Sequence, residues 1–252
     1  MSEHLLEIKD VALNYHTLKD EIQAINNISF CVDKNEFISI VGPSGCGKTT
    51  LLSIISGLLK PSSGKIILND EEVVKPSNHI GYMFQRDHLF EWRTVIQNIQ
   101  LGLEINKQIT DENKLYIDNL LKKYGLYEFK DKYPKHLSGG MRQRVALIRT
   151  LAMKPDLLLL DEPFGALDYQ TRKIVIQDVA SIIEKEQKTS ILVTHDLGEA
   201  VSLSDRIIIL SARPSQVKRE IKTNLRKIAS VDERKRTREF NDIVDEIWKE
   251  LS

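Results

Sequence analysis

The sequence of 252 residues is poor in cysteine and has no excess of either charge. Its two cysteines, Cys31 and Cys46, are too few for a disulfide scaffold, so we expect reduced thiols in a cytosolic protein. Lysine plus arginine number 36 and aspartate plus glutamate also number 36, which leaves a formal net charge of zero. Nucleic-acid-binding domains usually carry a basic excess, so this balance argues against DNA or RNA as a partner.

Long hydrophobic runs are also absent. The longest, at residues 157–160 and 207–210, are far shorter than the roughly 18 residues that a membrane-spanning helix needs. The first ten residues contain early acidic side chains and no apolar core, so we expect no signal peptide. We therefore expect a soluble chain that reaches a membrane only through a partner.

What the sequence does contain is a glycine-rich segment, GPSGCGKTT, at residues 42–50. It follows an apolar stretch, FISIV at residues 37–41, that is typical of a buried strand. It precedes residues 50–59, where apolar side chains recur at helical spacing. A strand, a glycine-rich loop and a helix form the context of a phosphate-binding loop, and this context argues against a chance match.

The residue types in this segment suit phosphate chemistry. Gly42, Gly45 and Gly47 permit backbone conformations in which several N–H groups converge on one anion. The helix that starts there adds unpaired N–H groups and the positive end of its dipole. Lys48 supplies a mobile charge for the β- and γ-phosphates, and Thr49 supplies a hydroxyl for Mg²⁺. The remaining members of the predicted nucleotide-binding loop are Pro43, Ser44, Cys46 and Thr50.

The order of the expected elements indicates an α/β fold. Short strands before the loop, at residues 5–9, 11–15 and 28–32, predict an antiparallel β-layer. Residues 87–135 have a helical pattern and form an expected insertion. Beyond residue 155 strands and helices alternate, which implies a parallel sheet covered by helices.

The last segment predicts an amphipathic helix, because apolar residues fall on one face. They are Phe240, Ile243, Val244, Ile247, Trp248 and Leu251. This face either packs on its own domain or docks onto a partner or a second copy.

Two carboxylates, Asp161 and Glu162, end the apolar strand at residues 157–160. In a fold with a phosphate loop, a carboxylate at such a strand tip organises Mg²⁺. The next carboxylate can accept a proton from an attacking water, a role worth about 10²–10⁴ in rate. The alternative is an acidic turn without a chemical role.

A second glycine motif, LSGGMRQR, contains Ser138, Gly139 and Gly140 and precedes a helical pattern. Such a helix start can face an anion. Because the chain already has one phosphate loop, a second one makes sense if it serves the nucleotide of another copy. A tight turn before a helix is the alternative.

Six motifs of the sequence resemble those of the ATPase subunit of ABC transporters, and the resemblance covers nearly the whole chain. GPSGCGKTT resembles the family's Walker A loop, LLLLDE its Walker B strand and LSGGMRQR its signature motif. Asp168, with the two residues before it, resembles the D-loop, Gln85 the Q-loop glutamine and His195 the switch histidine. Tyr15 resembles the aromatic residue that stacks on adenine, although a lone aromatic can equally belong to a core.

The resemblance implies a P-loop NTPase of ABC type that is a single ATPase domain and uses ATP and Mg²⁺. Its core and β-layer would occupy residues 1–86 and 155–222, its helical subdomain residues 87–154 and a C-terminal helical extension residues 223–252. Two such domains join head to tail in the family, so that each ATP lies between the Walker A loop of one and the signature motif of the other.

Carried over to this chain, the resemblance implies that Lys48 and the loop amides hold the β- and γ-phosphates. Thr49 and Gln85 would bind Mg²⁺, and Asp161 would act on the metal. These roles are implied by the family resemblance alone.

The resemblance further implies that Glu162 polarises the attacking water and that His195 contacts the γ-phosphate. From the opposite subunit, Ser138 and Gly140 would close over the same phosphate, and Asp168 would line the interface. The expected partners are a second nucleotide-binding domain, most simply a second copy, and transmembrane permease subunits. An external solute-binding protein would take part indirectly, and the chain would lie at the cytoplasmic face of the cell membrane.

The stretch after Gln85, RDHLFEWRTV, resembles the segment that receives the coupling helix of the permease. Phe90 and Trp92 would line that groove, or they would pack into the helical insertion. The phrases LFEWRTVIQNI and DEPFGALD resemble the nitrate, sulfonate and taurine group of importers, whose relatives also carry thiamine precursors. The function implied is ATP hydrolysis that drives uptake of a small solute through a separate permease.

Three alternatives have different sequence signatures. An exporter with separate membrane subunits shares every catalytic motif. A soluble ABC ATPase acting on DNA or ribosomes has a long coiled coil or two ATPase domains, and neither is seen here. A small-molecule P-loop kinase would leave the second glycine motif and His195 unexplained.

Overall fold

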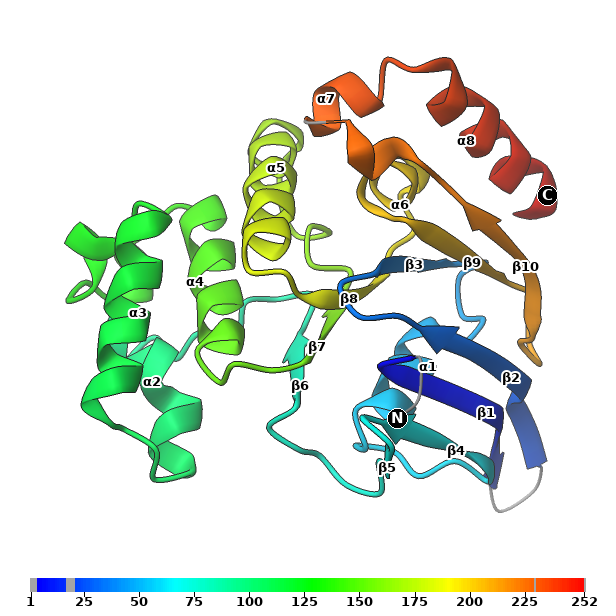
Figure 1. The fold of residues 1–252 in the computed structure, drawn as a ribbon, viewed down its shortest axis with the longest axis horizontal. Coiled ribbons are helices and arrows are strands. Elements are labelled where there is room, and N and C mark those ends of the chain that lie inside the picture. The colour runs from blue at the N-terminus through cyan, green and yellow to red at the C-terminus, as the bar shows by residue number, and fades with distance from the viewer. Residues whose placement is uncertain (1–3, 17–20, 229, 252) are drawn as a thin grey trace. The chain divides into compact units, whose positions relative to one another are not determined.

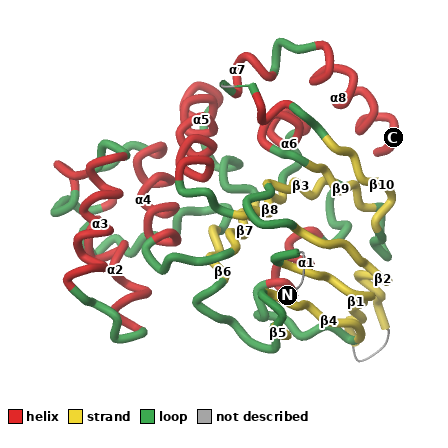
Figure 2. The backbone as a smooth tube through the Cα atoms, viewed as in Figure 1, coloured by secondary structure: helices red, strands yellow, loops and turns green. Residues whose placement is uncertain are grey.

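The computed structural model describes residues 4–16, 21–228 and 230–251, and the chain divides into two compact units. The first unit combines residues 1–77 with residues 188–252, and the second consists of residues 78–187. Most strands belong to the first unit, whereas helices predominate in the second (Figure 1, Figure 2). Residues 1–3, the start of the segment tested for a signal peptide, lie outside the described residues.

An antiparallel sheet forms one layer of the first unit. Its strands, in spatial order, are β2 (Glu21–Val32), β1 (Leu6–His16), β4 (Ser63–Leu68) and β5 (Glu71–Glu72). The two strands expected at residues 5–9 and 11–15 are one strand with an irregularity between them. Asp10 has a φ of 50°, and the register of β1 against β2 shifts between Ile8 and Val11. An acidic residue in this bulge therefore interrupts the apolar pattern without ending the strand.

Three parallel strands form the second layer of the first unit. β3 (Phe37–Val41) pairs in parallel with β8 (Thr189–Val193) and with β9 (Arg206–Leu210). β10 (Val217–Lys222) adds an antiparallel edge strand beside β9. Every residue of β3 and β8 is buried, as expected for parallel strands covered on both faces.

Two helices begin at the carboxyl ends of these strands. α1 (Lys48–Ile55) follows β3, and α6 (Leu197–Leu203) follows β8. α1 is shorter than the helix expected at residues 50–59, because the chain turns at Gly57, which has a φ of 75°. Since parallel strands end at the same edge of a sheet, the residues after β3 and β8 lie near each other.

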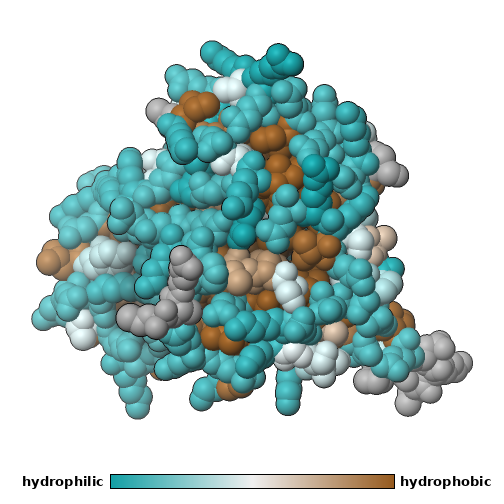
Figure 3. All heavy atoms as spheres, turned by 45° about the vertical axis from the view of Figure 1, so that its right-hand side comes forward, coloured by the Kyte–Doolittle hydropathy of each residue, from teal (hydrophilic) through white to brown (hydrophobic). Residues whose placement is uncertain are grey.

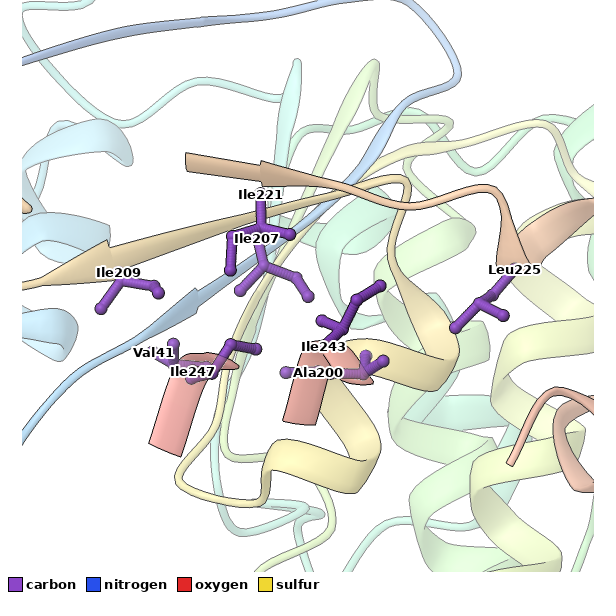
Figure 4. Packing of buried hydrophobic residues seen from close by; sticks show 9 residues of the cluster. Val41, Ala200, Ile207, Ile209, Ile221, Leu225, Ile243 and Ile247 are labelled. Atoms are coloured by element: carbon purple, nitrogen blue, oxygen red, sulfur yellow. The ribbon is translucent and has the colours of Figure 1, made fainter. Parts of the chain in front are cut away.

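The C-terminal segment packs on the first unit. It contains a short 3₁₀ turn (Leu225–Lys227), α7 (Val231–Arg234) and α8 (Arg238–Leu251). Ile243 and Ile247 of α8 are buried against Ala200 of α6 and against Ile207 and Ile221 of the neighbouring strands (Figure 4). Most of the amphipathic face therefore packs on its own domain, whereas Trp248 of that face is 66% exposed.

The second unit contains a helical part and a pair of parallel strands. β6 (Ile80–Met83) pairs with β7 (Leu157–Asp161), and Met83 lies opposite Leu160. The helices are α2 (Val95–Ile105), α3 (Asp111–Lys123), α4 (Gly139–Leu151) and α5 (Tyr169–Lys185), with 3₁₀ turns at Tyr127–Phe129 and Pro134–His136. α4 packs against α2 and α5 and also contacts β6.

The surface agrees with the absence of long apolar runs. Hydrophilic residues predominate on the face shown in Figure 3, with hydrophobic residues in patches between them. Within the described residues, none of the helices has both the length and the apolar character that a bilayer crossing requires.

Candidate nucleotide-binding and catalytic site

The loop between β3 and α1 has the backbone of an anion-binding segment. Gly45 and Gly47 have φ values of 74° and 112°, in the left-handed region that glycine adopts without strain. Gly47 is also the N-cap of α1, and as a glycine it has no side chain to accept a hydrogen bond from the first turn of this helix. The N–H groups of that turn are therefore oriented toward the loop without a side-chain cap.

Lys48 is buried and is held by the loop itself. Its Nζ donates to the carbonyl oxygens of Gly42 and Pro43 at 2.9 and 3.0 Å. The ammonium group thus lies over the first residues of the loop, where the sequence places it for phosphate binding. Cys46 is buried beside it, and burial raises the pKa of the Cys46 thiol. The exposed Ser44 and Thr49 and the partly buried Thr50 complete the predicted segment.

His195 lies at the same edge of the parallel sheet, because it follows β8 as Gly42 follows β3. Its ring is exposed, and the turn that carries it is built by buried neighbours. The Thr194 hydroxyl donates to Glu199 Oε2 at 2.7 Å and accepts from the Asp196 N–H at 3.0 Å. Asp196 in turn caps α6 by accepting from the Glu199 N–H. Sequence reasoning identified His195 but not this support.

Tyr15 lies near the end of β1, where it pairs with Ile22. Its side chain is 41% exposed, so it does not belong to the core of the sheet. Stacking on adenine stays a prediction.

The second unit brings Gln85, Asp161 and Glu162 together. Gln85 lies just beyond β6 and Glu162 just beyond β7, and these strands are adjacent and parallel. Gln85 Nε2 donates to Glu162 Oε2 at 3.4 Å. Asp161 is buried and accepts a hydrogen bond from the Tyr82 hydroxyl at 3.1 Å.

The backbone at Glu162 has an unusual conformation. Its φ is 46°, which is uncommon for a residue with a side chain. Such conformations cluster at functional sites, where the surrounding structure holds them. Here Gly165 supplies the space, because a Cβ at that position would lie 3.2 Å from Gln85 Nε2 and 3.4 Å from the Glu162 carbonyl oxygen.

The signature residues begin α4. Ser138 is the N-cap and accepts from the Met141 N–H at 3.3 Å, and both Ser138 and Gly139 are exposed. Gly140 is buried, and a Cβ there would lie 2.8 Å from Val175 Cγ2 of α5. Glycine at 140 is therefore required for the close approach of the two helices.

Asp168 has a structural role in this chain. It caps α5 by accepting from the N–H groups of Gln170 and Thr171, both at 3.1 Å. The hydrogen bonds from Thr171 are the main reason that the pKa of Asp168 lies below its ordinary value. The role at a subunit interface stays a prediction.

The segment after Gln85 is fastened to α4 by two arginines that sequence reasoning missed. Arg142 Nε donates to Asp87 Oδ2 at 2.8 Å, and Arg149 donates to the carbonyl oxygens of Asp87 and His88 at 2.7 and 2.8 Å. The two arginines are seven residues apart, hence on one face of a helix, and this spacing was the available signal. A cavity of about 390 Å³ lies between this segment, the start of α4 and Leu167.

Phe90 and Trp92 follow in a loop that Asn98 holds. The Asn98 side chain is fully buried and bonds to the N–H and carbonyl of Phe90 at 2.7 and 3.1 Å. The rings of Phe90 and Trp92 stack at 4.8 Å between centroids, and Trp92 is 71% exposed. Trp92 therefore does not pack into the helical part of the unit.

Comparison with known proteins decides the family. The family model described as ABC transporter matches residues 25–165, which is more than half of the chain. The chain belongs to the ABC transporter family. An ABC transporter ATP-binding protein of Bacillus subtilis, YtlC, is 45% identical over 98% of this chain and 95% of its own length.

Two further relatives have assigned import roles. The aliphatic sulfonates import ATP-binding protein SsuB of Bacillus thuringiensis is 42% identical over 87% of this chain and 86% of its own length. The taurine import ATP-binding protein TauB of Ruegeria pomeroyi is 38% identical over 96% of this chain and 94% of its own length. Among solved structures, a dimer of the ATP-binding cassette MJ0796 with ADP and Pi is similar, with a TM-score of 0.71 and 32% identity over 86% of this chain and 98% of that one.

These likenesses confirm the predicted ABC fold, ATP as the nucleotide and the role of an ATPase coupled to transport. They also confirm the interpretation of the chain as the nucleotide-binding subunit of an importer, and they do not favour the exporter or nucleic-acid alternatives. The subunit works with a membrane transporter.

Proposed function

We propose that this importer subunit drives uptake of a small sulfonate- or taurine-like solute, with nitrate as a further candidate of the same group. The observation that carries the proposal is the similarity to SsuB and TauB, which extends over 87% and 96% of the chain. The ATPase itself does not contact the solute. The solute would be selected by an external binding protein and would pass through separate permease subunits.

The nucleotide phosphates would be bound by the loop at residues 42–50. Lys48 is already positioned over this loop by two carbonyl oxygens, 2.9 and 3.0 Å away, so little side-chain ordering remains on binding. The N–H groups of Gly45, Gly47 and the first turn of α1 would face the phosphates, and Tyr15 would stack on the adenine ring. His195, at the same sheet edge, would contact the γ-phosphate.

The residues assigned to Mg²⁺ suit that ion. Mg²⁺ binds oxygen ligands and is usually held by one or two carboxylates together with substrate phosphates and water. The buried Asp161 carboxylate, the Gln85 side-chain oxygen and the Thr49 hydroxyl are ligands of this kind. Bound there, Mg²⁺ would neutralise charge on the β- and γ-phosphates.

Glu162 would be the general base for hydrolysis. Its Oε2 accepts from Gln85 Nε2 at 3.4 Å, and this contact orients the carboxylate. The left-handed backbone at Glu162 directs the side chain away from the path that a regular strand would take.

A second copy of the chain would complete each site. Ser138 and Gly139 are exposed at the start of α4, where the helix dipole favours an anion. They would close, with Gly140, over the γ-phosphate of an ATP bound to the other copy. ATP binding would then favour the closed dimer and hydrolysis would release it, which is a shift between two populations.

The permease would contact the surface formed by Phe90, Trp92 and the cavity beside Asp87. Trp92 is largely exposed, stacks on Phe90 and lies in a loop that the buried Asn98 holds in place. Exposed and well-supported aromatic residues of this kind often anchor protein interfaces. This contact would place the subunit at the cytoplasmic face of the membrane.

The variant Glu162→Gln tests the proposal. We expect it to bind ATP normally but to hydrolyse it about 10²–10⁴-fold more slowly, because the general base is lost. Glu112→Gln is the matched control, because this glutamate is 82% exposed in its side chain and lies on α3. If Glu162→Gln hydrolyses ATP at the rate of the control, Glu162 is not the base.

Partners and solute require a second experiment. Tagged Glu162→Gln, with ATP and Mg²⁺, is used to capture proteins from detergent-solubilised native membranes, which are then identified by mass spectrometry. We expect a multi-span permease, whose reconstituted complex is stimulated by a binding protein loaded with a sulfonate, taurine or nitrate. Recovery of soluble or nucleic-acid-associated proteins alone would contradict the importer proposal, and stimulation by an unrelated solute alone would contradict the solute class.

A further inference from the structure

The loop at residues 211–216, which connects β9 and β10, lies against the phosphate loop. A Cβ on Gly42 would lie 3.0 Å from the Leu210 carbonyl oxygen, and a Cβ on Gly47 would lie 3.5 Å from the Ser215 hydroxyl oxygen. Between these two contacts, Arg213 Nη2 donates to the carbonyl oxygen of Gly45 at 2.9 Å. The end of β9 and the 211–216 loop therefore lie beside three glycines of the phosphate loop, and Arg213 forms a hydrogen bond to one of them.

The 211–216 loop is itself fixed to β2. Ser215 is fully buried, its N–H donates to the Ala24 carbonyl at 3.1 Å and its carbonyl accepts from the Asn26 N–H at 2.9 Å. The Ser215 hydroxyl also donates to the Ala24 carbonyl at 3.2 Å. Arg213 thus extends from a support that does not depend on the phosphate loop.

We propose that Arg213 is a positioning residue for ATP binding, acting through the carbonyl group of Gly45. The inference rests on the proposed role of residues 42–50 in phosphate binding. The carbonyl of Gly45 and the N–H of Cys46 belong to one planar peptide and point in opposite directions. Arg213 holds the carbonyl end, while the Cys46 N–H donates to the Pro43 carbonyl at 3.2 Å.

Among the described residues, the space beside the Cα atom of Gly45 is open, so packing there does not restrain this residue. It has a φ of 74°, and a Cβ at this position would have no atom within 4 Å. Glycine loses more conformational freedom on ordering than any other residue. A tether that orders the 45–46 peptide before ATP arrives lowers the entropy lost on binding, and therefore raises affinity.

The charge of Arg213 offers a different mechanism, direct attraction of the phosphates, and the two make different predictions. A tether needs a hydrogen-bond donor, whereas attraction needs a positive charge. Arg213→Gln keeps a donor and removes the charge, and Arg213→Ala removes both. A direct hydrogen bond of 2.9 Å is little weakened when the salt concentration rises. The attraction between an exposed charge and more distant phosphates, in contrast, is screened by salt.

Equilibrium binding and steady-state hydrolysis with the full chain form the first test. We expect Arg213→Ala to raise both Kd and KM for ATP about three- to tenfold, the net contribution of one typical hydrogen bond. We expect kcat at saturating ATP and the unfolding midpoint to stay unchanged, because the residue neither reaches the reacting atoms nor fills a core. Arg213→Gln should recover most of the affinity at any salt concentration.

Two controls separate this inference from the assignment of the loop. Arg238→Ala, on α8 and 93% exposed in its side chain, should bind ATP as the wild type does. Lys48→Ala should lose ATP binding. If Lys48→Ala binds ATP normally, the assignment of the phosphate loop fails. If Lys48→Ala loses binding while Arg213→Ala matches the wild type, only the inference about Arg213 fails.

The thiol of Cys46 gives an independent readout of loop order. It is buried, with 1% of the residue exposed, so a small alkylating reagent reaches it only when the loop opens. Cys31→Ser removes the other cysteine. In that background without ATP, we expect Arg213→Ala to be alkylated several-fold faster than the parent.

Whether Arg213→Ala speeds or slows the alkylation of Cys46 distinguishes a looser loop from a loss of charge. The charge of Arg213 lowers the pKa of the Cys46 thiol, against the larger effect of burial, so removal of the charge alone would make the reactive thiolate rarer and slow the reaction. Faster alkylation therefore requires a looser loop. Unchanged or slower alkylation, or an affinity that Arg213→Gln does not recover, would overturn the proposal.

Discussion

The phosphate loop of the first unit is shaped mainly by its backbone, whereas the residues around Glu162 in the second unit are held by side chains. Gly45 and Gly47 supply left-handed conformations, and Lys48 bonds to carbonyl oxygens. In the second unit, Tyr82 bonds to Asp161 and Gln85 to Glu162. The difference matches the chemistry expected of each part, because amides that bind an anion need a shape, whereas a base and a metal ligand need orientation.

Mutations in the two units should therefore differ in how they affect ATP binding and hydrolysis. In the first unit, changes at Lys48 and at the glycines should have the largest effects, and changes of other side chains, including Arg213, should have smaller ones. In the second unit, effects should spread through the hydrogen-bonded side chains that hold Gln85 and Glu162.

Lys48→Ala should reduce ATP hydrolysis more than about a hundredfold, because the one mobile charge over the phosphates is lost. Lys60→Ala, an exposed lysine just after α1, is the control and should keep the wild-type rate. Steady-state hydrolysis at Mg²⁺ and ATP concentrations that saturate the wild type checks this. A loss of less than about threefold would mean that the backbone of the loop is sufficient without its lysine.

Gly140→Ala should reduce hydrolysis about tenfold, because the new Cβ would lie 2.8 Å from Val175 Cγ2 and would push the start of α4 out of place. Overpacking of this kind costs about 1–3 kcal/mol. Thermal unfolding and hydrolysis are measured together with the double variant Gly140→Ala/Val175→Ala. If removal of the valine methyls recovers neither property, steric crowding is not the cause.

Asp87→Asn should destabilise the chain by about 1–2 kcal/mol at neutral pH, because it weakens the charged hydrogen bond with Arg142. Burial raises the pKa of Asp87, but the hydrogen bonds from Arg142 and from the Leu89 N–H together lower it below its ordinary value. A carboxylate with a lowered pKa stabilises the folded state above its unfolded value of about 4, and this contribution is lost as the pH falls through the folded value.

The difference in unfolding free energy between wild type and Asp87→Asn should therefore shrink as the pH falls below about 4. Denaturant titrations between neutral and acidic pH measure it, with the exposed Asp131→Asn of the same unit as control. A difference that stays constant with pH would show that the charge of Asp87 does not contribute.

Tyr15→Ala should have the smallest effect, a loss of about threefold in ATP affinity, because an exposed ring contributes only part of a full stacking interaction. Tyr15→Phe keeps the ring and should bind as the wild type does. Fluorescence titration with ATP measures both. Equal loss in the two variants would assign the contribution to the hydroxyl group, and no loss in either would remove Tyr15 from the site.

Local patterns predicted much of the fold and most of the candidate site. The strand Phe37–Val41, the loop after it and the carboxylates after residue 160 lie in the predicted order because each signal is contained in about ten consecutive residues. The bulge at Asp10 was misinterpreted as a gap between strands. A polar residue that ends an apolar pattern does not reveal whether pairing continues beyond it.

Contacts between residues far apart in the chain could not be predicted from the sequence. Arg213 is 168 residues from Gly45, and Arg142 is 55 residues from Asp87. No periodicity or motif connects such pairs, because their proximity depends on how strands and helices pack. The sequence therefore did not predict the side chains that support the candidate site, although it predicted the candidate residues themselves.

Sedimentation of Glu162→Gln with ATP and Mg²⁺ measures whether two copies of the chain share each ATP. We expect a dimer that forms only with ATP, and a monomer that still binds ATP when Ser138→Arg is added to block the exposed start of α4. An ATP-bound Glu162→Gln that stays monomeric, or a dimer that Ser138→Arg leaves intact, would contradict it.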